Sequence, residues 1–305
     1  MRALAPGKLF IFGEYTVLEG GSALIYPAPL QARTESSASE DSIVMAHSTH
    51  EVRFNLSEAL RQLPLVSAIA ETIGVHCFKK KTTFLDTRPF FKGKHKLGLG
   101  SSSALTVSTI KCLCPGINIE ETIELATRSH NLFQKKKGSG GDVALAAHGQ
   151  SILFDKAEGA RPVARPKDLH LLAVWTGNSA STSDFLLKLA KWKTESEKLF
   201  YSKMEELAHI SLSCTQNVEE QNISNLIENI IRFDTALEAF SNTSQLNFYS
   251  DDHLRMKNEC RKAGLSYKPS GAGGGDFGIS FGDDVQRIQE FSERLSSKNI
   301  FNFIL

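Results

Sequence analysis

The hydrophobic and polar positions of the chain follow two different periods. Apolar residues recur every three or four positions over several long stretches, which places them on one face of a helix. Shorter apolar runs bounded by turn-forming residues are typical of strands. The pattern predicts helices over 60–73, 102–114, 119–134, 142–148, 183–210, 223–240, 251–263 and 285–295. It predicts strands over 9–12, 23–26, 43–45, 52–54, 151–154, 169–175, 277–281 and 300–305.

The connections between these elements indicate how they are arranged. The turn-forming segment Glu19-Gly20-Gly21 separates the first two strands, which we expect to form a hairpin that ends at Pro27 and Pro29. A proline-rich connection over 159–166 indicates a domain change. The last three elements follow a strand–helix–strand order, which favours an α+β sandwich. Four aromatic residues at helical spacing are expected in the core: Trp192, Phe200, Tyr201 and Phe240.

The composition is that of an ordinary globular protein. At 305 residues with 41% hydrophobic content, the chain is long enough for two domains or one large one. Its 35 basic and 34 acidic residues give a formal net charge of +1, so no global field favours nucleic acid or a membrane surface. We therefore expect a small-molecule partner whose charge is balanced by individual side chains and backbone groups at its binding site.

Cysteine usage and hydropathy bear on the compartment. Five cysteines, an odd number, do not form a disulfide framework, and Cys112-Leu113-Cys114 lacks the spacing of a zinc site. The start Met1–Pro6 is too short for a signal peptide, and no apolar run reaches the length of about 18 residues that a membrane span needs. These features predict a soluble, cytoplasmic protein with reduced thiols.

A glycine-rich turn leads into the predicted helix 102–114. Its sequence, Gly98-Leu99-Gly100-Ser101-Ser102-Ser103, places unpaired N–H groups and three hydroxyls at a helix N-terminus, where the helix dipole favours an anion. The turn matches neither the G-x-x-x-x-G-K-[ST] loop nor the G-x-G-x-x-G loop of common nucleotide-binding proteins. It predicts a phosphate site, and the alternative is a helix capped by a serine.

Two further glycine clusters favour the phosphate interpretation. Gly138-Ser139-Gly140-Gly141-Asp142 precedes a predicted helix, and the longer cluster 270–276 precedes a predicted strand. Clustered glycines permit positive φ angles and close approach of the backbone to a ligand. Any one cluster is compatible with a simple turn, but three together indicate a shared ligand. We expect the three loops to line one cleft between the two halves of the chain.

Together with the segment Ala5–Tyr15, the three loops resemble the three motifs of the GHMP small-molecule kinases in order and approximate spacing. The resemblance spans nearly the whole chain. Mevalonate kinases of this superfamily typically carry a glycine at the position of Asp276. The details instead most resemble the phosphomevalonate kinase family, over the segments Gly13–Leu18, Lys96–Ser102, Lys137–Ala144, Trp175–Thr182 and Pro269–Asp276.

The resemblance implies an α+β protein with the two-domain GHMP kinase fold. An N-terminal α/β nucleotide-binding domain would span residues 1–160, and a C-terminal α+β sandwich of ferredoxin-like type would span residues 161–305. The implied activity is phosphorylation of 5-phosphomevalonate to 5-diphosphomevalonate with ATP and Mg²⁺, in the mevalonate route to isoprenoids, by a monomer or homodimer. Two alternatives stay open: mevalonate kinase or another GHMP kinase acting on a small alcohol, and a catalytically inactive nucleotide-binding protein.

The resemblance also assigns roles to individual residues. Lys8 and Asp142 are the implied catalytic residues, each holding the charge state of the other. The implied nucleotide-binding residues are Gly98, Leu99, Gly100, Ser101, Ser102 and Ser103, and Ser102 is also the implied Mg²⁺ ligand. Gln134 stands roughly where mevalonate kinases place a metal-binding glutamate, and His130 beside it is typical of a structural histidine.

The expected substrate-binding residues come from four segments of the chain. The hydroxyl-rich turn after the strand 169–175 is the candidate for binding the acceptor's own phosphate, with Lys268 or Tyr15 as further candidates. The substrate-binding residues that we expect are Tyr15, Ser139, Gly140, Ser179, Ser181, Thr182, Gly271, Ala272 and Gly273.

Overall fold

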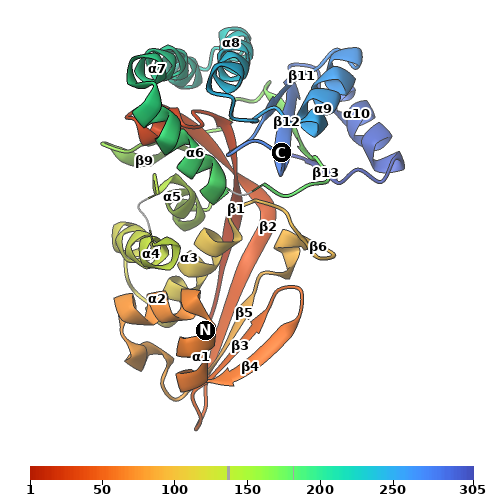
Figure 1. Ribbon diagram of the computed structural model, residues 1–305. Coiled ribbons are helices and arrows are strands. Elements are labelled where there is room, and N and C mark those ends of the chain that lie inside the picture. Colours follow the sequence, from red (N-terminus) through yellow and green to blue (C-terminus); the bar gives the residue numbers. More distant parts are fainter. Residues whose placement is uncertain (136–137, 181) are drawn as a thin grey trace. The chain divides into compact units, whose positions relative to one another are not determined.

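The computed structural model describes residues 1–135, 138–180 and 182–305 (Figure 1). The chain divides by compactness into two units, residues 1–8 with 27–150 and residues 9–26 with 151–305. It therefore passes from one unit to the other after Lys8, after Tyr26 and after Gln150. The two domains expected from the sequence, residues 1–160 and 161–305, are each one continuous stretch of chain, and the boundary between them stays a prediction.

The first unit contains a sheet with helices on one face. The later part of β2 (Ser22–Ala38) pairs antiparallel with β5 (Lys81–Asp86), β5 pairs parallel with β3 (Ile43–His47), and β3 pairs antiparallel with β4 (Glu51–Asn55). The helices are α1 (Leu56–Gln62), α2 (Pro64–Ile73), α3 (Ser101–Leu113), α4 (Ile119–Gln134) and α5 (Gly141–His148). The short elements are η2 (Val75–Phe78), η3 (Arg88–Phe90), β6 (Phe91–Lys92) and β7 (His95–Lys96). Helix α3 packs against β5, α4 and α5 (Figure 1).

Four helices of this unit begin in two different ways. Asn55 and Asn118 cap α1 and α4 through capping boxes, in which a glutamate at the third helical position returns the hydrogen bond. Helices α3 and α5 instead begin at Gly100 and Gly140, which have left-handed φ angles of 77° and 90° and provide no side-chain cap. The first N–H groups of α3 are therefore left open, whereas in α5 the N–H groups of Gly141 and Val143 donate to Ser139 Oγ and Asp142 Oδ1.

The second unit contains two groups of strands. Residues 22–25 of β2 pair antiparallel with β8 (Ile152–Asp155), which pairs with β9 (Gly159–Pro162). Strand β1 (Arg2–Phe12) pairs with β2; its residues 2–8 belong to the first unit and its residues 9–12 to the second. A four-stranded antiparallel sheet has the order β11 (Ser266–Pro269), β12 (Phe277–Gly282), β10 (His170–Trp175), β13 (Asn302–Ile304). The helical elements are η1 (Thr16–Leu18), α6 (Thr182–Glu195), α7 (Glu197–Glu219), α8 (Ile223–Ser244), α9 (Asp251–Lys262) and α10 (Val285–Ser297).

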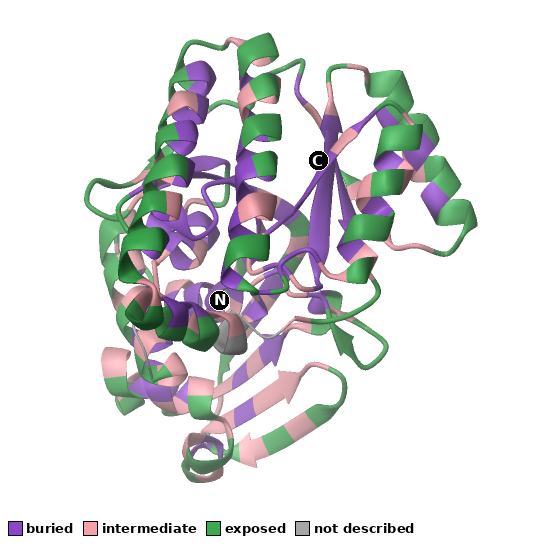
Figure 2. Cartoon of the chain, turned by 45° about the horizontal axis from the view of Figure 1, so that its top comes forward, coloured by how far each residue is buried: buried purple, intermediate pink, exposed green. Residues whose placement is uncertain are grey.

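Apolar side chains hold this unit together. Helices α9 and α10 pack on the four-stranded sheet through buried residues such as Val174, Met256 and Phe291. Helices α7 and α8 pack against each other, and each carries buried residues along one side and exposed residues along the other (Figure 2). This one-sided burial is what the period of three to four residues in the sequence predicts.

The structure confirms the α+β class and the hairpin of β1 and β2, but β2 is longer than expected. It continues through Pro27 and Pro29, where the prediction ended it. The two prolines fall between residues 22–25, which pair with β8, and residues 33–38, which pair with β5. Neither of these two ladders needs the N–H groups that proline lacks.

Two predicted helices are interrupted. Pro64 is the first residue of α2, so the stretch 60–73 divides into the end of α1 and the whole of α2. Ser196, with φ −140°, separates α6 from α7 within the stretch 183–210. Tyr201 is 45% exposed, so the expectation that it lies in the core is wrong.

Candidate active site

The serine-rich loop forms an open helix N-terminus in the first unit. Gly98 and Gly100 have left-handed φ angles of 71° and 77°, which turn the chain into α3. No side chain caps α3, so the alternative of a serine-capped helix is wrong; Ser103 Oγ donates to the carbonyl of Gly100 (2.8 Å) instead. The amides of Ser101 and Ser102 have no carbonyl one turn earlier to bond. These amides and the helix dipole can receive an anion.

Lys8 lies beside this loop. Its N–H donates to the carbonyl of Leu99 (2.9 Å), and the buried Leu99 side chain anchors the turn. A Cβ placed on Gly100 would come within 3.2 Å of Lys8 Cγ, so the lysine side chain runs past the glycine. The structure therefore brings Lys8 together with the predicted nucleotide loop.

Ser102 belongs to a chain of hydrogen bonds with α4. Its Oγ lies 3.0 Å from Nε2 of the buried His130, and the side-chain nitrogen of Gln134 lies 3.2 Å from the same Nε2. Because an amide NH₂ only donates, Nε2 accepts and the Ser102 hydroxyl directs its proton to it. The lone pairs of Ser102 Oγ are then left for another partner. His130 thus orients Ser102, a role that the sequence did not indicate.

This arrangement fits a magnesium ion shared with phosphates. Mg²⁺ is usually held by one or two protein oxygens together with substrate phosphates and waters. Within residues 1–135, 138–180 and 182–305, no three His, Cys, Asp or Glu side chains form a metal cluster. The Ser102 hydroxyl, oriented by His130, is the type of single oxygen ligand that a phosphate-bound Mg²⁺ uses.

Asp142 lies in the first turn of α5. Its Oδ1 accepts a hydrogen bond from the N–H of Val143 (2.9 Å), and Ser139 Oγ accepts a long one (3.4 Å) from the amide two residues later. Helix α5 opens at the left-handed Gly140 and packs against α3. The two helices of this unit that begin at a left-handed glycine are therefore neighbours. The pairing of Asp142 with Lys8 stays a prediction.

The third glycine loop connects β11 to β12 in the second unit and is tied at several points. Ser270 Oγ donates to the carbonyl of Phe10 (3.0 Å). Nε2 of the buried His253 lies 2.9 Å from the carbonyl oxygen of Gly275 and donates to it. These contacts fix both ends of the loop to neighbouring elements.

The middle of this loop presents open amides. Gly271, Gly273 and Gly274 have left-handed φ angles of 92°, 72° and 75°. The N–H groups of Ala272, Gly273 and Gly275 donate to no residue in the part of the chain that the structure describes. Successive backbone N–H groups in such a turn form an anion-binding nest. The loop is thus suited to a phosphate or a carboxylate.

Tyr15 supports the glycine loop. Its hydroxyl donates to the carbonyl of Ala272, and its ring packs on Phe248 with 4.5 Å between ring centres. Burial, reinforced by the negative charge of Glu14, raises the pKa of Tyr15 well above its usual value, so the phenol stays a neutral donor. Its direct contact with a substrate stays a prediction.

Lys268 is fully buried in β11. Its ammonium group donates to the carboxylate of Glu14 and to the carbonyl of Pro269 (2.6 Å). This burial argues against the expectation that Lys268 binds the phosphate of an acceptor.

Asp276 fastens the turn after β10 to the glycine loop. Its N–H donates to the carbonyl of Asn178 (2.8 Å), and its Oδ1 accepts from the N–H of Ala180 (3.0 Å). Its carbonyl accepts from both the N–H and the hydroxyl of Thr176, each at 2.9 Å. Asp276 has φ 57°, a conformation that is uncommon outside glycine. The two segments are therefore held together by one buried aspartate.

The hydroxyl-rich turn is described only in part. Ser179 is exposed on this turn. Ser181 lies outside the described residues, and Thr182 is described only as the first residue of α6. The assignment of these three residues to the substrate stays a prediction.

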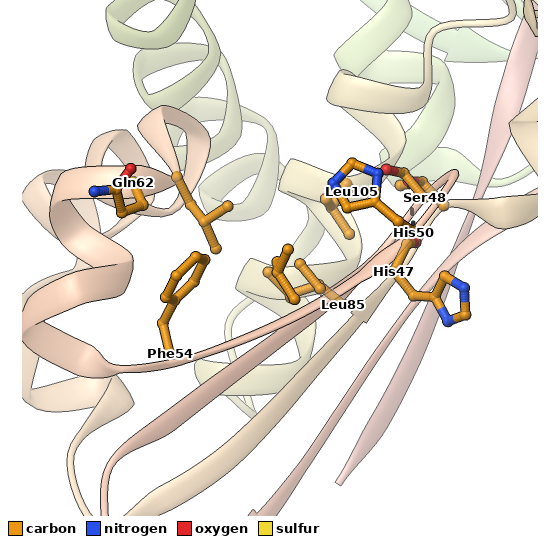
Figure 3. Close-up of a pocket in the computed structure, with 11 residues that line it drawn as sticks. His47, Ser48, His50, Phe54, Gln62, Leu85 and Leu105 are labelled. Carbon is orange, nitrogen blue, oxygen red and sulfur yellow. Dashed lines mark hydrogen bonds between the residues drawn. The ribbon is translucent and has the colours of Figure 1, made fainter. Parts of the chain in front are cut away.

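A cavity of about 350 Å³ lies beside α3 in the first unit (Figure 3). Phe54, Leu85 and Leu105 form part of its apolar lining, and His47 and Gln62 contribute polar groups. Its volume falls within the range of roughly 300–1,000 Å³ that is typical of small-molecule sites. Leu105 lies about one helical turn after the open amides of α3. Sequence reasoning missed this cavity because its lining comes from separate elements.

Two further findings concern the compartment. The described ranges contain no helix with both the length and the apolar character that a bilayer span requires. All five cysteines are free thiols. The cytoplasmic location stays a prediction.

Comparison with known sequences supports the motif analysis. Residues 68–150 match the family described as GHMP kinases N terminal domain. The phosphomevalonate kinase of Streptomyces sp. strain CL190 is 26% identical, and the match covers 92% of this chain and 89% of that protein. The phosphomevalonate kinase of Saccharolobus solfataricus is 24% identical, with 95% of this chain and 93% of that protein covered.

Solved structures share the fold. The Streptococcus pneumoniae phosphomevalonate kinase in complex with phosphomevalonate and AMPPNP matches with a TM-score of 0.81 at 20% identity, covering 100% of both chains. The L. major mevalonate kinase in complex with R-mevalonate matches with a TM-score of 0.76 at 18% identity, covering 100% of this chain and 95% of that one. The protein therefore carries a GHMP kinase N-terminal domain at residues 68–150 and has the fold of the GHMP kinases, as its motifs predicted.

Proposed function

We propose that the protein is an ATP-dependent phosphomevalonate kinase that converts 5-phosphomevalonate to 5-diphosphomevalonate. The observation that carries the proposal is the open N-terminus of α3, where Gly100 leaves the first amides uncapped beside Lys8. The two curated relatives named phosphomevalonate kinase support the choice of acceptor.

The first unit would bind the nucleotide. The amides of Ser101–Ser103 and the positive end of the α3 dipole would receive its phosphates. The cavity lined by Phe54, Leu85 and Leu105 would receive the base, because a mixed apolar and polar lining suits a heteroaromatic ring. Both features share α3, so one helix would orient both ends of the nucleotide.

Ser102 would hold Mg²⁺ together with the nucleotide phosphates. When bound, the metal supplies neutralisation of negative charge on the phosphates. His130 would keep the Ser102 hydroxyl turned so that an oxygen lone pair, not the proton, faces the metal. Gln134 would keep His130 in the accepting state through its own donated hydrogen bond.

In the proposed reaction, an oxygen of the acceptor's phosphate forms a bond to the terminal phosphorus of ATP. The bond from that phosphorus to the bridging oxygen breaks, and the electron pair leaves with ADP. Such a transfer depends on positioning and on electrostatic stabilisation. Lys8 would supply positive charge at the transferred group. The second pKa of a phosphate monoester is about 6, so the acceptor is mostly a dianion at neutral pH and Asp142 would orient Lys8 rather than remove a proton.

The acceptor would bind to open backbone groups and hydroxyls. In the second unit these are the loop residues Gly271, Ala272 and Gly273, of which Ala272 and Gly273 offer open amides, together with Tyr15 and the hydroxyls of Ser179, Ser181 and Thr182. In the first unit Ser139 and Gly140, before α5, would contribute. We propose a monomer or homodimer in the cytoplasm.

The deciding experiment compares mevalonate and 5-phosphomevalonate as acceptors, with ADP release as the readout. We expect kcat/KM for 5-phosphomevalonate to exceed that for mevalonate by at least about 100-fold, because the two differ by a charged group that the site must pair. A Lys8→Met variant prepared in parallel shows whether the ADP release comes from this protein. A preference for mevalonate, or ATP binding without turnover of either acceptor, would overturn the proposal.

A further inference from the structure

A fully buried ion pair lies beneath the glycine loop of the second unit. Lys268 of β11 is 0% exposed, and Glu14, which follows β1, is 2% exposed. The Lys268 ammonium donates to Glu14 Oε1 and to the carbonyl of Pro269, and it lies 5.9 Å from the ring centre of Phe233. Both charges are therefore removed from water and face each other in largely apolar surroundings.

The alternation of β11 explains why a lysine points inward here. Its neighbour Tyr267 belongs to the apolar core formed with α9 and α10. Successive residues of a strand point to opposite faces, so Lys268 points to the other face, toward Phe233 of α8 and Glu14. Pairing of Lys268 with Ile279 of β12 fixes its backbone.

Stability alone does not account for this pair. Removing two charges from water is costly, and apolar residues of similar volume often serve a buried position as well or better. Glu14 Oε2 is buried and has no hydrogen-bond partner within the described residues, which adds to that cost.

The pair is joined to the glycine loop by consecutive contacts. Glu14 Oε1 accepts from the N–H of Gly271 (3.4 Å) as well as from Lys268. On either side of Glu14, Phe10 accepts from Ser270 and Tyr15 donates to Ala272. Three consecutive loop residues are thus attached to the segment 10–15 that Glu14 belongs to. Lys268, in the strand β11 that leads into the loop, holds the carboxylate of Glu14 in place.

We infer that Lys268 and Glu14 are positioning residues for the acceptor. The pair sets the orientation of the Gly271–Gly273 backbone, and thereby the direction of the open amides that receive an anionic group. This inference rests on the proposed function in taking the anionic group to belong to phosphomevalonate. Neither side chain touches the substrate; both act through the loop.

The test combines a measurement on the protein alone with kinetics. In Lys268→Met and in the double variant Glu14→Gln/Lys268→Gln, we expect amide hydrogen exchange of the hydrogen-bonded loop residues Gly271, Gly274 and Asp276 to accelerate by about tenfold or more. We expect KM for phosphomevalonate to rise by about tenfold, with KM for ATP changed by less than about twofold. Lys268→Met leaves the buried carboxylate of Glu14 without its partner and can prevent folding. The double variant replaces both charges with neutral side chains that can still form hydrogen bonds, so we expect it to fold even if the single variant does not.

Lys257→Met is the matched control. Lys257 also forms a partly buried pair, with Asp234 (2.6 Å) and Glu238 (2.7 Å), but among the described residues it makes no hydrogen bond or ion pair with the glycine loop. We expect this variant to lower stability without changing exchange in the loop or KM for the acceptor.

The outcomes separate the inference from the proposed function. If the wild type does not turn over phosphomevalonate, the proposed function fails, while loop exchange still decides the positioning role. If the folded double variant shows wild-type loop exchange, the pair is only structural and the inference is overturned. An equal change in the Lys257→Met control would overturn it in the same way.

Discussion

The side chain of Lys8 runs across the open face of Gly100, so that a methyl group added to Gly100 would come within 3.2 Å of Lys8 Cγ. The same methyl group would lie 3.1 Å from Ser103 Oγ. One glycine therefore keeps space for the predicted catalytic lysine and also forms the left-handed turn that opens α3.

Gly100→Ala should therefore impair turnover beyond its effect on stability. Alanine at φ 77° costs roughly 1–2 kcal/mol of folding free energy, and the added methyl group pushes Lys8 away from the loop. We expect kcat/KM for ATP to fall by at least about tenfold. Gly116→Ala is the control, since Gly116 has φ 93° and no atom within 4 Å of an added Cβ. Equal losses of activity in the two variants would contradict the prediction.

Ser102→Ala should weaken turnover much more than stability. It removes one hydrogen bond, to His130, which is worth about 1 kcal/mol of unfolding free energy. It also removes the proposed Mg²⁺ ligand, so we expect Mg·ATP-dependent turnover to fall by at least about tenfold. Ser108→Ala on the same helix, which removes a buried hydroxyl bonded to Thr34, should lower stability and leave the kinetics unchanged. Normal kinetics with a large loss of stability in Ser102→Ala would disprove the metal role.

The pH profiles of Asp142→Asn and Asp142→Ala distinguish orientation from proton removal. Because a phosphate monoester is mostly a dianion above pH of about 6, a base has little to remove. We expect the asparagine variant to retain more activity than the alanine variant with phosphomevalonate, and its rate to change little from about pH 7 to 9. A positioned base typically contributes about 10²–10⁴-fold, so steep recovery over that range would identify Asp142 as a base.

His253 should make stability fall on acidification. Burial lowers the pKa of His253 from 6.5 to about 4. On acidification the unfolded chain therefore takes up a proton that the folded protein excludes. The free energy of unfolding has its full value above about pH 6.5 and falls as the pH drops toward 4. A shift of this size corresponds to roughly 3 kcal/mol.

Urea denaturation of His253→Gln checks this. The variant lacks the titrating group, so between about pH 7 and pH 4 its free energy of unfolding should fall by roughly 3 kcal/mol less than that of the wild type. His209→Gln, at an exposed position of α7, should follow the wild type. Parallel pH dependence of wild type and His253→Gln would show that His253 is not the responsible group.

Local sequence predicts the glycine loops and the helices well, because each depends on neighbouring residues. The helices α3 and α4 begin and end within a residue of the stretches expected from their periodicity. The interruption at Ser196 was not foreseen, since no glycine or proline marks it. There the ring of Trp192 packs edge-on against Phe200 across the break.

Contacts between distant residues could not be predicted in this way. Glu14 and Lys268 are separated by 254 positions, and nothing in either local segment indicates a partner. The contact of Ser102 with His130 likewise depends on how α3 packs on α4. The motifs thus indicate which residues are candidates, whereas the side chains that orient them become visible only once the chain is folded.

The chain crosses from one unit to the other three times, and this affects how the gene can be divided. Residues 9–26 belong to the second unit although they precede most of the first. A fragment starting at residue 161 would leave Lys268 buried without Glu14 and Ser270 without its acceptor on Phe10. The coding sequences of the two units are interleaved, so neither unit can be transferred to another protein, or deleted from this one, as a single cassette.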